Sequence, residues 1–240
     1  MNEQFYMMIG LSFPFFMNAL GAFFIFFTPE IKQKGVLDGL SAGIMTSACI
    51  WSLIIPAINL SAHLGAFAFL PACIGLAFGA VLIYLSDLLL KKRIKRNDLN
   101  KLFWAITLHN IPEGLAVGFA FGSNGLNVIN ALSVAFGIGV QNMPEGLAVA
   151  LAYKSGGKNK LKSFCYGVIS GAVEPISALI GALLVNFISF LQPYILALSA
   201  GAMIYVIVEE LIPKSVQSKR GVWGFIGGFC LMMALDLALS

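Results

Sequence analysis

Two apolar stretches decide the fold, LFWAITLHNIPEGLAVGFAFG at positions 102–122 and VINALSVAFGIGVQNMPEGLAVALA at positions 128–152. Each is long enough for a helix to cross the hydrocarbon core of a bilayer, which takes about 20 residues. The joint between them, Ser123-Asn124-Gly125, is very tight, so we predict that the two helices form an antiparallel pair. Both stretches contain the same motif, HNIPEGLAV at 109–117 and QNMPEGLAV at 141–149.

Helical geometry places the polar residues of each motif on one face, because residues i, i+3 and i+4 lie side by side. The first copy presents His109, Asn110 and Glu113. The second copy presents Gln141, Asn142 and Glu145. The proline of each motif removes a backbone donor and frees or kinks the chain four residues earlier. The glycine that follows the glutamate allows a close approach between helices.

The composition indicates a membrane protein. Hydrophobic residues make up 59% of the chain and charged residues 11%, with a mean hydropathy of +0.89. In an ordinary soluble domain, hydrophobic residues make up roughly 45–50% and charged residues roughly 25%. We therefore predict an all-α polytopic protein in which residues 1–240 form a single transmembrane domain of eight helices, at about 5–27, 36–58, 67–90, 102–122, 128–152, 162–187, 191–212 and 222–239.

The basic residues predict the orientation. Every Lys and Arg falls in the first, third, fifth or seventh loop, and none lies at the termini or in the even-numbered loops. By the positive-inside rule the odd loops are cytoplasmic and both termini are extracytoplasmic. The net charge of +4 is therefore a topology signal and not a nucleic-acid surface. Short loops and the lack of a targeting signal favour a prokaryotic inner membrane.

Three carboxylates lie within predicted membrane spans, where ionisable residues usually have a function. Glu113, Glu145 and Glu174 fall within predicted spans four, five and six, and no span core contains a Lys or Arg. A charge at a helix centre costs roughly 2.5–3.5 kcal/mol on insertion scales. The acids are therefore protonated, exposed to water or bound to a cation, and their number favours the cation.

The ligand types indicate the kind of cation. Oxygen ligands with one imidazole suit a borderline divalent ion such as Zn²⁺, Fe²⁺, Mn²⁺ or Co²⁺. A two-metal site bridged by Glu113 and Glu145 is chemically reasonable, although the spacing does not require it. Without the joint pattern, a lone His109 would be read as a hydrogen-bond donor and each asparagine as a contact between helices.

Other residues leave two interpretations open. Met45 is a soft ligand or ordinary packing, and packing is commoner. Glu210 caps a helix end or joins Glu209 near the cytoplasmic end of span seven. Asp87 and Asp236 are interfacial or functional. The four cysteines are predicted to be small buried hydrophobes, and the glycines from Gly224 to Gly228 serve either homodimerisation or internal packing.

The two motifs resemble those of the ZIP (Zrt/Irt-like) metal transporters, and the Gln141-Asn142-x-Pro144-Glu145-Gly146 form is similar to the GufA-like branch. Span seven adds Glu209-Glu210-Leu211-Ile212-Pro213 to the likeness, which covers essentially the whole chain. The resemblance implies an eight-helix bundle and a metal centre formed by His109, Asn110, Glu113, Gln141, Asn142, Glu145 and Glu174, with Met45 as a further candidate. It also implies an inner exit lined by Asp87, Glu209 and Glu210, with Asp236 attracting cations outside.

The resulting hypothesis is a secondary transporter and not an enzyme, which moves zinc or a related ion (Cd²⁺, Fe²⁺, Mn²⁺) into the cytoplasm. No GxxxxGK[ST] signature for ATP is present, so transport would follow a gradient or be coupled to protons. Two alternatives use the same ligands. One is an intramembrane metalloenzyme, which lacks an HExxH motif, and the other is a membrane metal sensor that binds without conducting.

Overall fold

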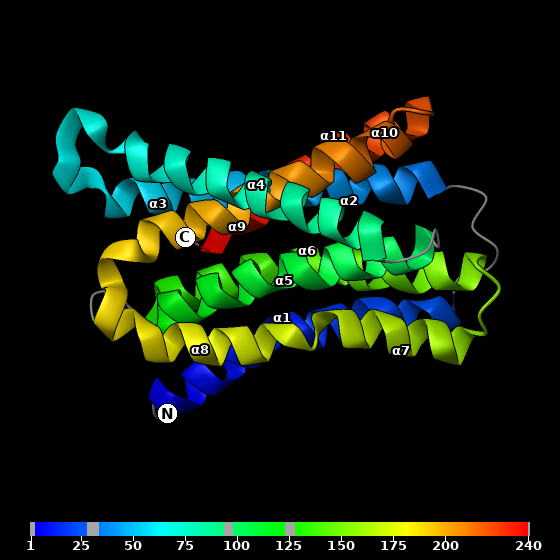
Figure 1. Ribbon diagram of the computed structural model, residues 1–240, viewed down its shortest axis with the longest axis horizontal. Helices are drawn as coiled ribbons and strands as arrows, with labels where there is room; N and C mark the ends of the chain where they lie inside the picture. The colour runs from blue at the N-terminus through cyan, green and yellow to red at the C-terminus, as the bar shows by residue number, and fades with distance from the viewer. Residues whose placement is uncertain (1–2, 28–33, 94–97, 123–127, 240) are drawn as a thin grey trace.

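The computed structural model describes residues 3–27, 34–93, 98–122 and 128–239, which form helices and contain no strand. The helices run side by side along the long axis of the molecule (Figure 1). The long ones are α1 (Glu3–Phe23), α2 (Lys34–Ala48), α4 (Phe69–Arg93), α5 (Asp98–Gly122), α6 (Val128–Ser155), α7 (Lys160–Gly171), α8 (Val173–Ile188), α9 (Gln192–Val206) and α11 (Lys219–Leu239). Short elements join them, among them α3 (Ile55–Leu60) and α10 (Ile212–Ser215).

The predicted membrane character holds for most of the described helical segments. Six of them are long and apolar enough to cross a bilayer, Phe5–Phe26, Gly35–Leu60, Leu70–Leu89, Lys160–Val185, Gln192–Ser215 and Lys219–Ala238. The chain is thus an all-α polytopic membrane protein. Helices α5 and α6 are not in this set, and they are the two that contain the repeated polar motif. The tight joint at Ser123-Asn124-Gly125 lies outside the described residues.

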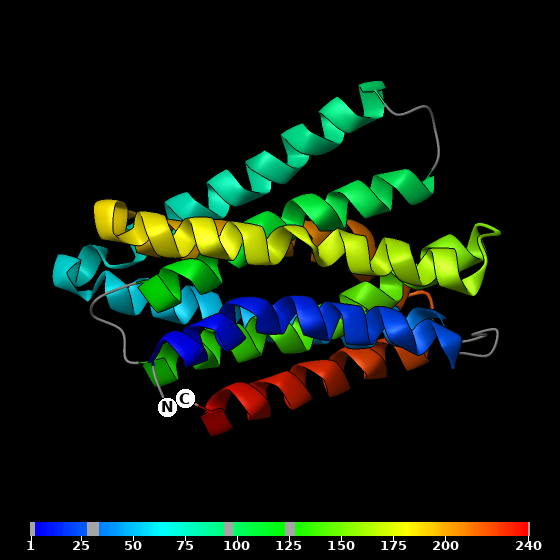
Figure 2. The ribbon, with the colours of Figure 1, turned by 90° about the horizontal axis from the view of Figure 1, so that it is seen from below.

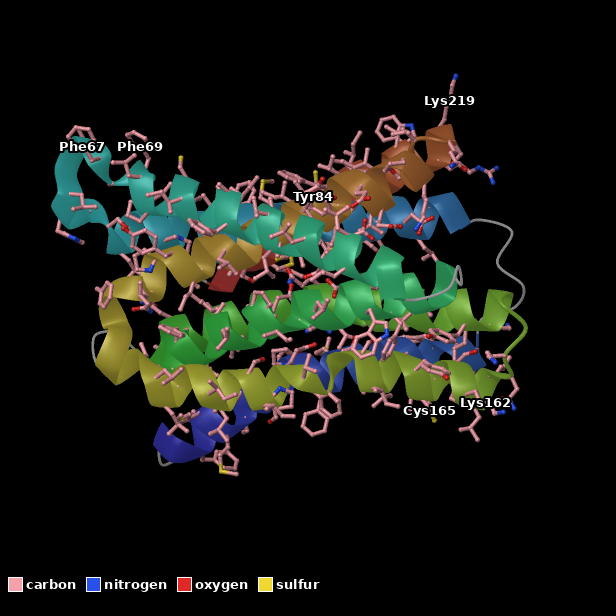
Figure 3. All side chains as sticks on the ribbon, in the orientation of Figure 1. Phe67, Phe69, Tyr84, Lys162, Cys165 and Lys219 are labelled. Carbon is pink, nitrogen blue, oxygen red and sulfur yellow. The ribbon has the colours of Figure 1, made fainter. Side chains whose placement is uncertain are left out.

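The two ends of the bundle differ in character. Helix α1 begins and α11 ends at the same end of the bundle (Figures 1 and 2). Phe67, before α4, and Phe69, its first residue, also lie at this end, whereas Lys162 and Lys219 lie at the opposite one (Figure 3). This arrangement agrees with the alternation of basic loops in the sequence, although Lys32, Lys95 and Arg96 fall outside the described residues.

Helices pack in close pairs, α1 with α6, α2 with α11, α4 with α9 and α5 with α8. Glycines permit the closeness. A Cβ added at Gly43 would lie 2.0 Å from the backbone oxygen of Phe225. Gly224 and Gly228 of α11 pack in turn on the backbone of α2, while Gly227 faces open space. Within this glycine-rich segment, Gly224 and Gly228 therefore serve internal packing.

Three helices are interrupted. The sixth predicted span is broken at Ala172, between α7 and α8. Two wider π-helical turns, Cys49–Ile54 and Ile207–Leu211, precede Pro56 and Pro213. A proline cannot donate to the carbonyl four residues earlier and clashes with it, so a wider turn relieves both problems.

The prediction that all four cysteines are buried was wrong for three of them. Cys73, Cys165 and Cys230 are exposed on the outside of the helices, and Cys49 alone is buried. The outer surface of a bilayer protein is apolar, so a cysteine is tolerated there as a small hydrophobe. Cys49 differs because it begins the first π turn and points into the bundle.

Candidate metal site

Three carboxylates are buried at the centre of the bundle. Glu113 on α5 is 0% exposed, Glu145 on α6 is 4% exposed and Glu174 on α8 is 1% exposed. Isolated ionised carboxylates at such burial would be very unfavourable, so each needs donors or a cation. The structure supplies amide donors to two of them.

Two side-chain amides of α6 hold two of these carboxylates. The Gln141 Nε2 donates to Glu113 Oε1 on α5, and the Asn142 Nδ2 donates to Glu174 Oε2 at 2.6 Å on α8. Both amides are fully buried, and their oxygens, Gln141 Oε1 and Asn142 Oδ1, have no hydrogen-bond partner. Adjacent residues of one motif thus connect the carboxylates of two different helices.

Asn110, in the first motif, has a different partner from Asn142. Its Nδ2 donates at 3.0 Å to the backbone oxygen of Ser170, in the last turn of α7. Asn18 on α1 donates in the same way at 2.8 Å to the backbone oxygen of Gly167. The break at Ala172 removes helical partners from the last carbonyls of α7, and Asn110 supplies a donor to the one of Ser170. The Gly167 carbonyl accepts from Ser170 Oγ at 2.7 Å as well as from Asn18. Sequence reasoning missed Asn18, whose only signal was an asparagine inside the Phe-rich first span.

The break after α7 also positions Glu174. This residue lies in the first turn of α8, where unpaired backbone N–H groups and the helix dipole favour negative charge. An uninterrupted span would have placed Glu174 at mid-helix without this electrostatic support. By contrast, α5 and α6 are continuous through Pro112 and Pro144.

The motif glycines hold the site helices against their neighbours. A Cβ at Gly114 would lie 2.0 Å from Ser177 Oγ and 2.5 Å from the backbone oxygen of Glu174. A Cβ at Gly146 would lie 2.0 Å from the backbone oxygen of Asn18. Each glutamate of the motif is therefore followed by a residue that brings its helix into backbone contact with a partner.

Sulfur atoms border the amide and carboxylate groups. The Met203 Sδ on α9 lies 3.7 Å from Gln141 Nε2 and 3.7 Å from the Cys49 Sγ. Met45 is 1% exposed and belongs to the same buried cluster as Cys49 and Met203. Neither Cys49 nor Met203 was predicted to lie near the site, although Cys49 follows Met45 by one helical turn.

The described part of the chain does not bring three His, Cys, Asp or Glu side chains together in a group that could hold a metal ion. His109 belongs to α5, and its side chain lies outside the described part of the structure. Two of the carboxylates contact amides instead, through Gln141 and Asn142. A cation bound here would take both carboxylate and amide oxygens as ligands.

The predicted path residues lie on α4, on the second π turn and on α11. On α11, Asp236 Oδ1 accepts a hydrogen bond of 2.7 Å from Ser52 Oγ. Asp87 on α4 is buried, while Glu209 is exposed in the second π turn. Glu210 forms an ion pair of 3.0 Å with Lys214, one helical turn away.

Comparison with known proteins decides the family. The ZIP Zinc transporter family matches residues 99–236, which include both motifs and Glu174. The chain belongs to the ZIP family of zinc transporters. It is 32% identical to Zinc transporter ZIP11 of Xenopus tropicalis, with 97% of each chain covered. It is 36% identical to Zinc transporter GufA of Myxococcus xanthus, with 93% of this chain and 94% of that protein covered.

A third relative is similar over part of the chain. Zinc transporter ZIPB of Bordetella bronchiseptica is 41% identical over 138 residues, which are 56% of this chain and 44% of that protein. The expected resemblance to ZIP transporters of the GufA-like branch is therefore confirmed. Members of this family transport zinc and are not enzymes, so the intramembrane metalloenzyme alternative is set aside.

Proposed function

We propose that this chain imports zinc, or a related divalent cation such as Cd²⁺, Fe²⁺ or Mn²⁺, into the cytoplasm through a site at mid-membrane. The ligands proposed are His109, Asn110, Glu113, Gln141, Asn142, Glu145 and Glu174, with Met45 beside them. One observation carries the proposal. Glu113, Glu145 and Glu174 are buried on three helices, and no Lys or Arg lies in any span core.

Charge balance explains why this arrangement favours a divalent cation. Buried carboxylates are stabilised by opposite charge or by donated hydrogen bonds. The amide groups of Gln141 and Asn142 supply donors to Glu113 and Glu174. A divalent ion supplies much more stabilisation than an amide, because its charge acts at short range in a medium of low dielectric constant.

The side-chain amides of Gln141 and Asn142 can act either as hydrogen-bond donors to a carboxylate or as oxygen ligands of a cation. A side-chain amide has an NH₂ group and a carbonyl oxygen on the same carbon. A half-turn of the terminal group of Gln141 or Asn142 would withdraw the donor from the carboxylate and present the oxygen to a cation. The two unpartnered amide oxygens are then used as ligands, and the carboxylate released by the amide becomes one as well.

The proposal includes eight spans in one transmembrane domain, residues 1–240, with both termini extracytoplasmic. Helices α5 and α6 have 25 and 28 residues, which is sufficient length for a span. Their polar residues lower their hydropathy, and these same residues face partner helices instead of lipid. The end of the bundle that contains Lys162 and Lys219 would face the cytoplasm in an inner membrane.

Acidic residues outside the centre would serve the entry and exit of the cation. Asp236, which accepts a hydrogen bond from Ser52, would attract cations at the outer side. At the inner side, the cations would be received by Asp87, Glu209 and Glu210. Glu210 is the weakest of these candidates because Lys214 already neutralises it.

The number of ions and the assembly are further parts of the proposal. Two adjacent ions are consistent with three carboxylates, since α6 reaches Glu113 through Gln141 and Glu174 through Asn142. A homodimer would need a surface other than Gly224 and Gly228, because both already pack on α2.

Uptake into proteoliposomes tests the function. We expect Zn²⁺ influx with the wild type and with Cys165→Ser, a control on the outer face of α7 (Figure 3). We expect no influx above protein-free vesicles with the Glu113→Ala plus Glu145→Ala variant. Stoichiometric Zn²⁺ binding by the wild type without influx would instead support the metal-sensor alternative.

A further inference from the structure

The buried thiol of Cys49 does not belong to the proposed carboxylate site, yet it lies against it. Cys49 Sγ and Met203 Sδ are 3.7 Å apart, on the first π turn and on α9. Gln141 Nε2 lies 3.7 Å from Met203 Sδ and donates to Glu113 Oε1 as well. Two sulfurs and one amide thus form a continuous row that ends at a carboxylate.

The distances agree with ligands of one tetrahedral ion. With metal–sulfur bonds of about 2.3 Å, two ligands of a tetrahedral site lie about 3.8 Å apart. The observed separation of the two sulfurs, 3.7 Å, is close to this value without any rearrangement. Met203 Sδ is also 3.7 Å from Gln141 Nε2, and the half-turn of the amide described above would bring Oε1 to that position.

A second observation points to a ligand at the same place. Gln141 is fully buried, and its Oε1 has no hydrogen-bond partner. A buried amide oxygen without a partner costs roughly 1–3 kcal/mol, which a bound cation would recover. The backbone oxygen of Ala200, 3.8 Å from Cys49 Sγ, adds another acceptor on α9.

We propose that Cys49, Met203 and the side-chain oxygen of Gln141 form a soft subsite for thiophilic d¹⁰ cations, adjacent to the carboxylate site. This inference rests on the proposed function, because it names a substrate class for the same central region. Thiolate and thioether ligands select soft ions, whereas carboxylates select harder ones. The thiolate is the ligand form of cysteine, so binding releases the thiol proton to water.

The π turn explains how Cys49 reaches this position. It is the first residue of Cys49–Ile54, where the helix widens ahead of Pro56. Met45, one turn earlier, is buried in the same cluster and would add a second thioether on that side. The other three cysteines are exposed, so they provide matched thiols that lack this environment.

Spectroscopy with Cd²⁺ alone tests the subsite. The starting protein is Cys73→Ser plus Cys165→Ser plus Cys230→Ser, in which Cys49 is the sole thiol. We expect an ultraviolet cadmium–thiolate charge-transfer band that saturates at one Cd²⁺ per chain. The band should disappear when Cys49→Ser is added, and its absence from the sole-thiol protein would overturn the proposal.

Met203→Leu is a second variant that conserves volume and is expected to fold. Loss of even an indirect metal contact costs roughly 10–100-fold in affinity, so we expect its Cd²⁺ affinity to fall by about tenfold or more. Unchanged affinity would exclude Met203 as a ligand. Zn²⁺ uptake by the sole-thiol protein is measured in parallel. A cadmium–thiolate band without Zn²⁺ uptake would support the subsite and refute the proposed transport function. Zn²⁺ uptake without the band would refute the subsite alone.

Discussion

The two copies of the motif have nearly the same sequence but use it differently. In the copy on α6, Asn142 contacts the Glu174 carboxylate, whereas in the copy on α5, Asn110 contacts the backbone oxygen of Ser170. The residue before the asparagine also differs, because the second copy has Gln141 where the first has His109. A sequence repeat therefore does not imply repeated roles. Gln141 and Asn142 of the copy on α6 donate to carboxylates of two other helices, whereas Asn110 of the other copy donates to a carbonyl beside a helix break.

The motif glycines are where the two copies are most alike, and changing them should have the largest effect. Gly146→Ala places a Cβ 2.0 Å from the Asn18 backbone oxygen, which cannot move as a side chain can. Overpacking costs about 1–3 kcal/mol, and we expect the upper end here, more than the roughly 1 kcal/mol by which alanine favours a helix. Thermal unfolding in detergent measures the loss.

Gly114→Ala is the matched variant of the first copy. It should also destabilise the protein, through the contact between α5 and α8, because a Cβ would lie 2.5 Å from the Glu174 backbone oxygen. Gly227→Ala, which meets open space on α11, is the control that should leave the melting temperature unchanged. Equal melting temperatures for all three variants would refute the backbone contacts.

The asparagines should differ in how strongly they affect binding. Asn142→Ala removes the donor to Glu174, so we expect Zn²⁺ affinity to fall by roughly 10–100-fold. Asn110→Ala removes a proposed ligand whose amide contacts the Ser170 carbonyl and not a carboxylate, so we expect a smaller fall in affinity, together with about 1–3 kcal/mol of destabilisation. Calorimetric titration and thermal unfolding of both variants make the comparison. Identical losses in the two assays would remove the distinction between the copies.

Making the copies more alike should change metal preference. Gln141→His gives the second copy the imidazole of the first and removes the amide that contacts Glu113. Imidazole favours Zn²⁺ over harder ions such as Mn²⁺, so we expect the Zn²⁺/Mn²⁺ affinity ratio to rise by about tenfold. Competition binding measures this ratio, and a ratio that falls would contradict Gln141 as a ligand position.

The smallest effect is expected outside both copies. Glu210→Gln breaks the partly exposed ion pair with Lys214, and such pairs contribute about 0–1 kcal/mol. We expect zinc uptake to change by less than about twofold, which would leave Glu210 as a helix-end residue. A complete loss of uptake would show that Glu210 is essential to the exit path.

Much of the fold was predictable because it depends on length and polarity. The predicted stretches coincide with helical segments, and the two motifs lie on helices α5 and α6 in contact through Gln141 and Glu113. The close packing at Gly114 and Gly146 was also expected from glycine after glutamate. The family was recognisable because its motif has many polar positions at fixed spacing.

The rest depends on contacts that a sequence does not display. The break at Ala172 lies in an apolar run, and only Pro175 signalled that a carbonyl there would lose its donor. The pairing of Asn110 with Ser170 follows from that break. Cys49 and Cys73 both lie in apolar runs of the sequence, yet Cys49 is buried and Cys73 is exposed. Such differences arise from the rotation of each helix, which packing determines.

Direct binding of Zn²⁺ to the purified protein tests the central claim, that the two copies of the motif form one metal site together with Glu174. Equilibrium titration would compare the wild type with Glu113→Gln, Glu145→Gln and the double variant. We expect each single substitution to weaken binding strongly, and the double variant to weaken it by less than the sum of the two, because both residues hold the same ions. Unchanged binding in the double variant, or strictly additive effects of two independent sites, would contradict a shared centre.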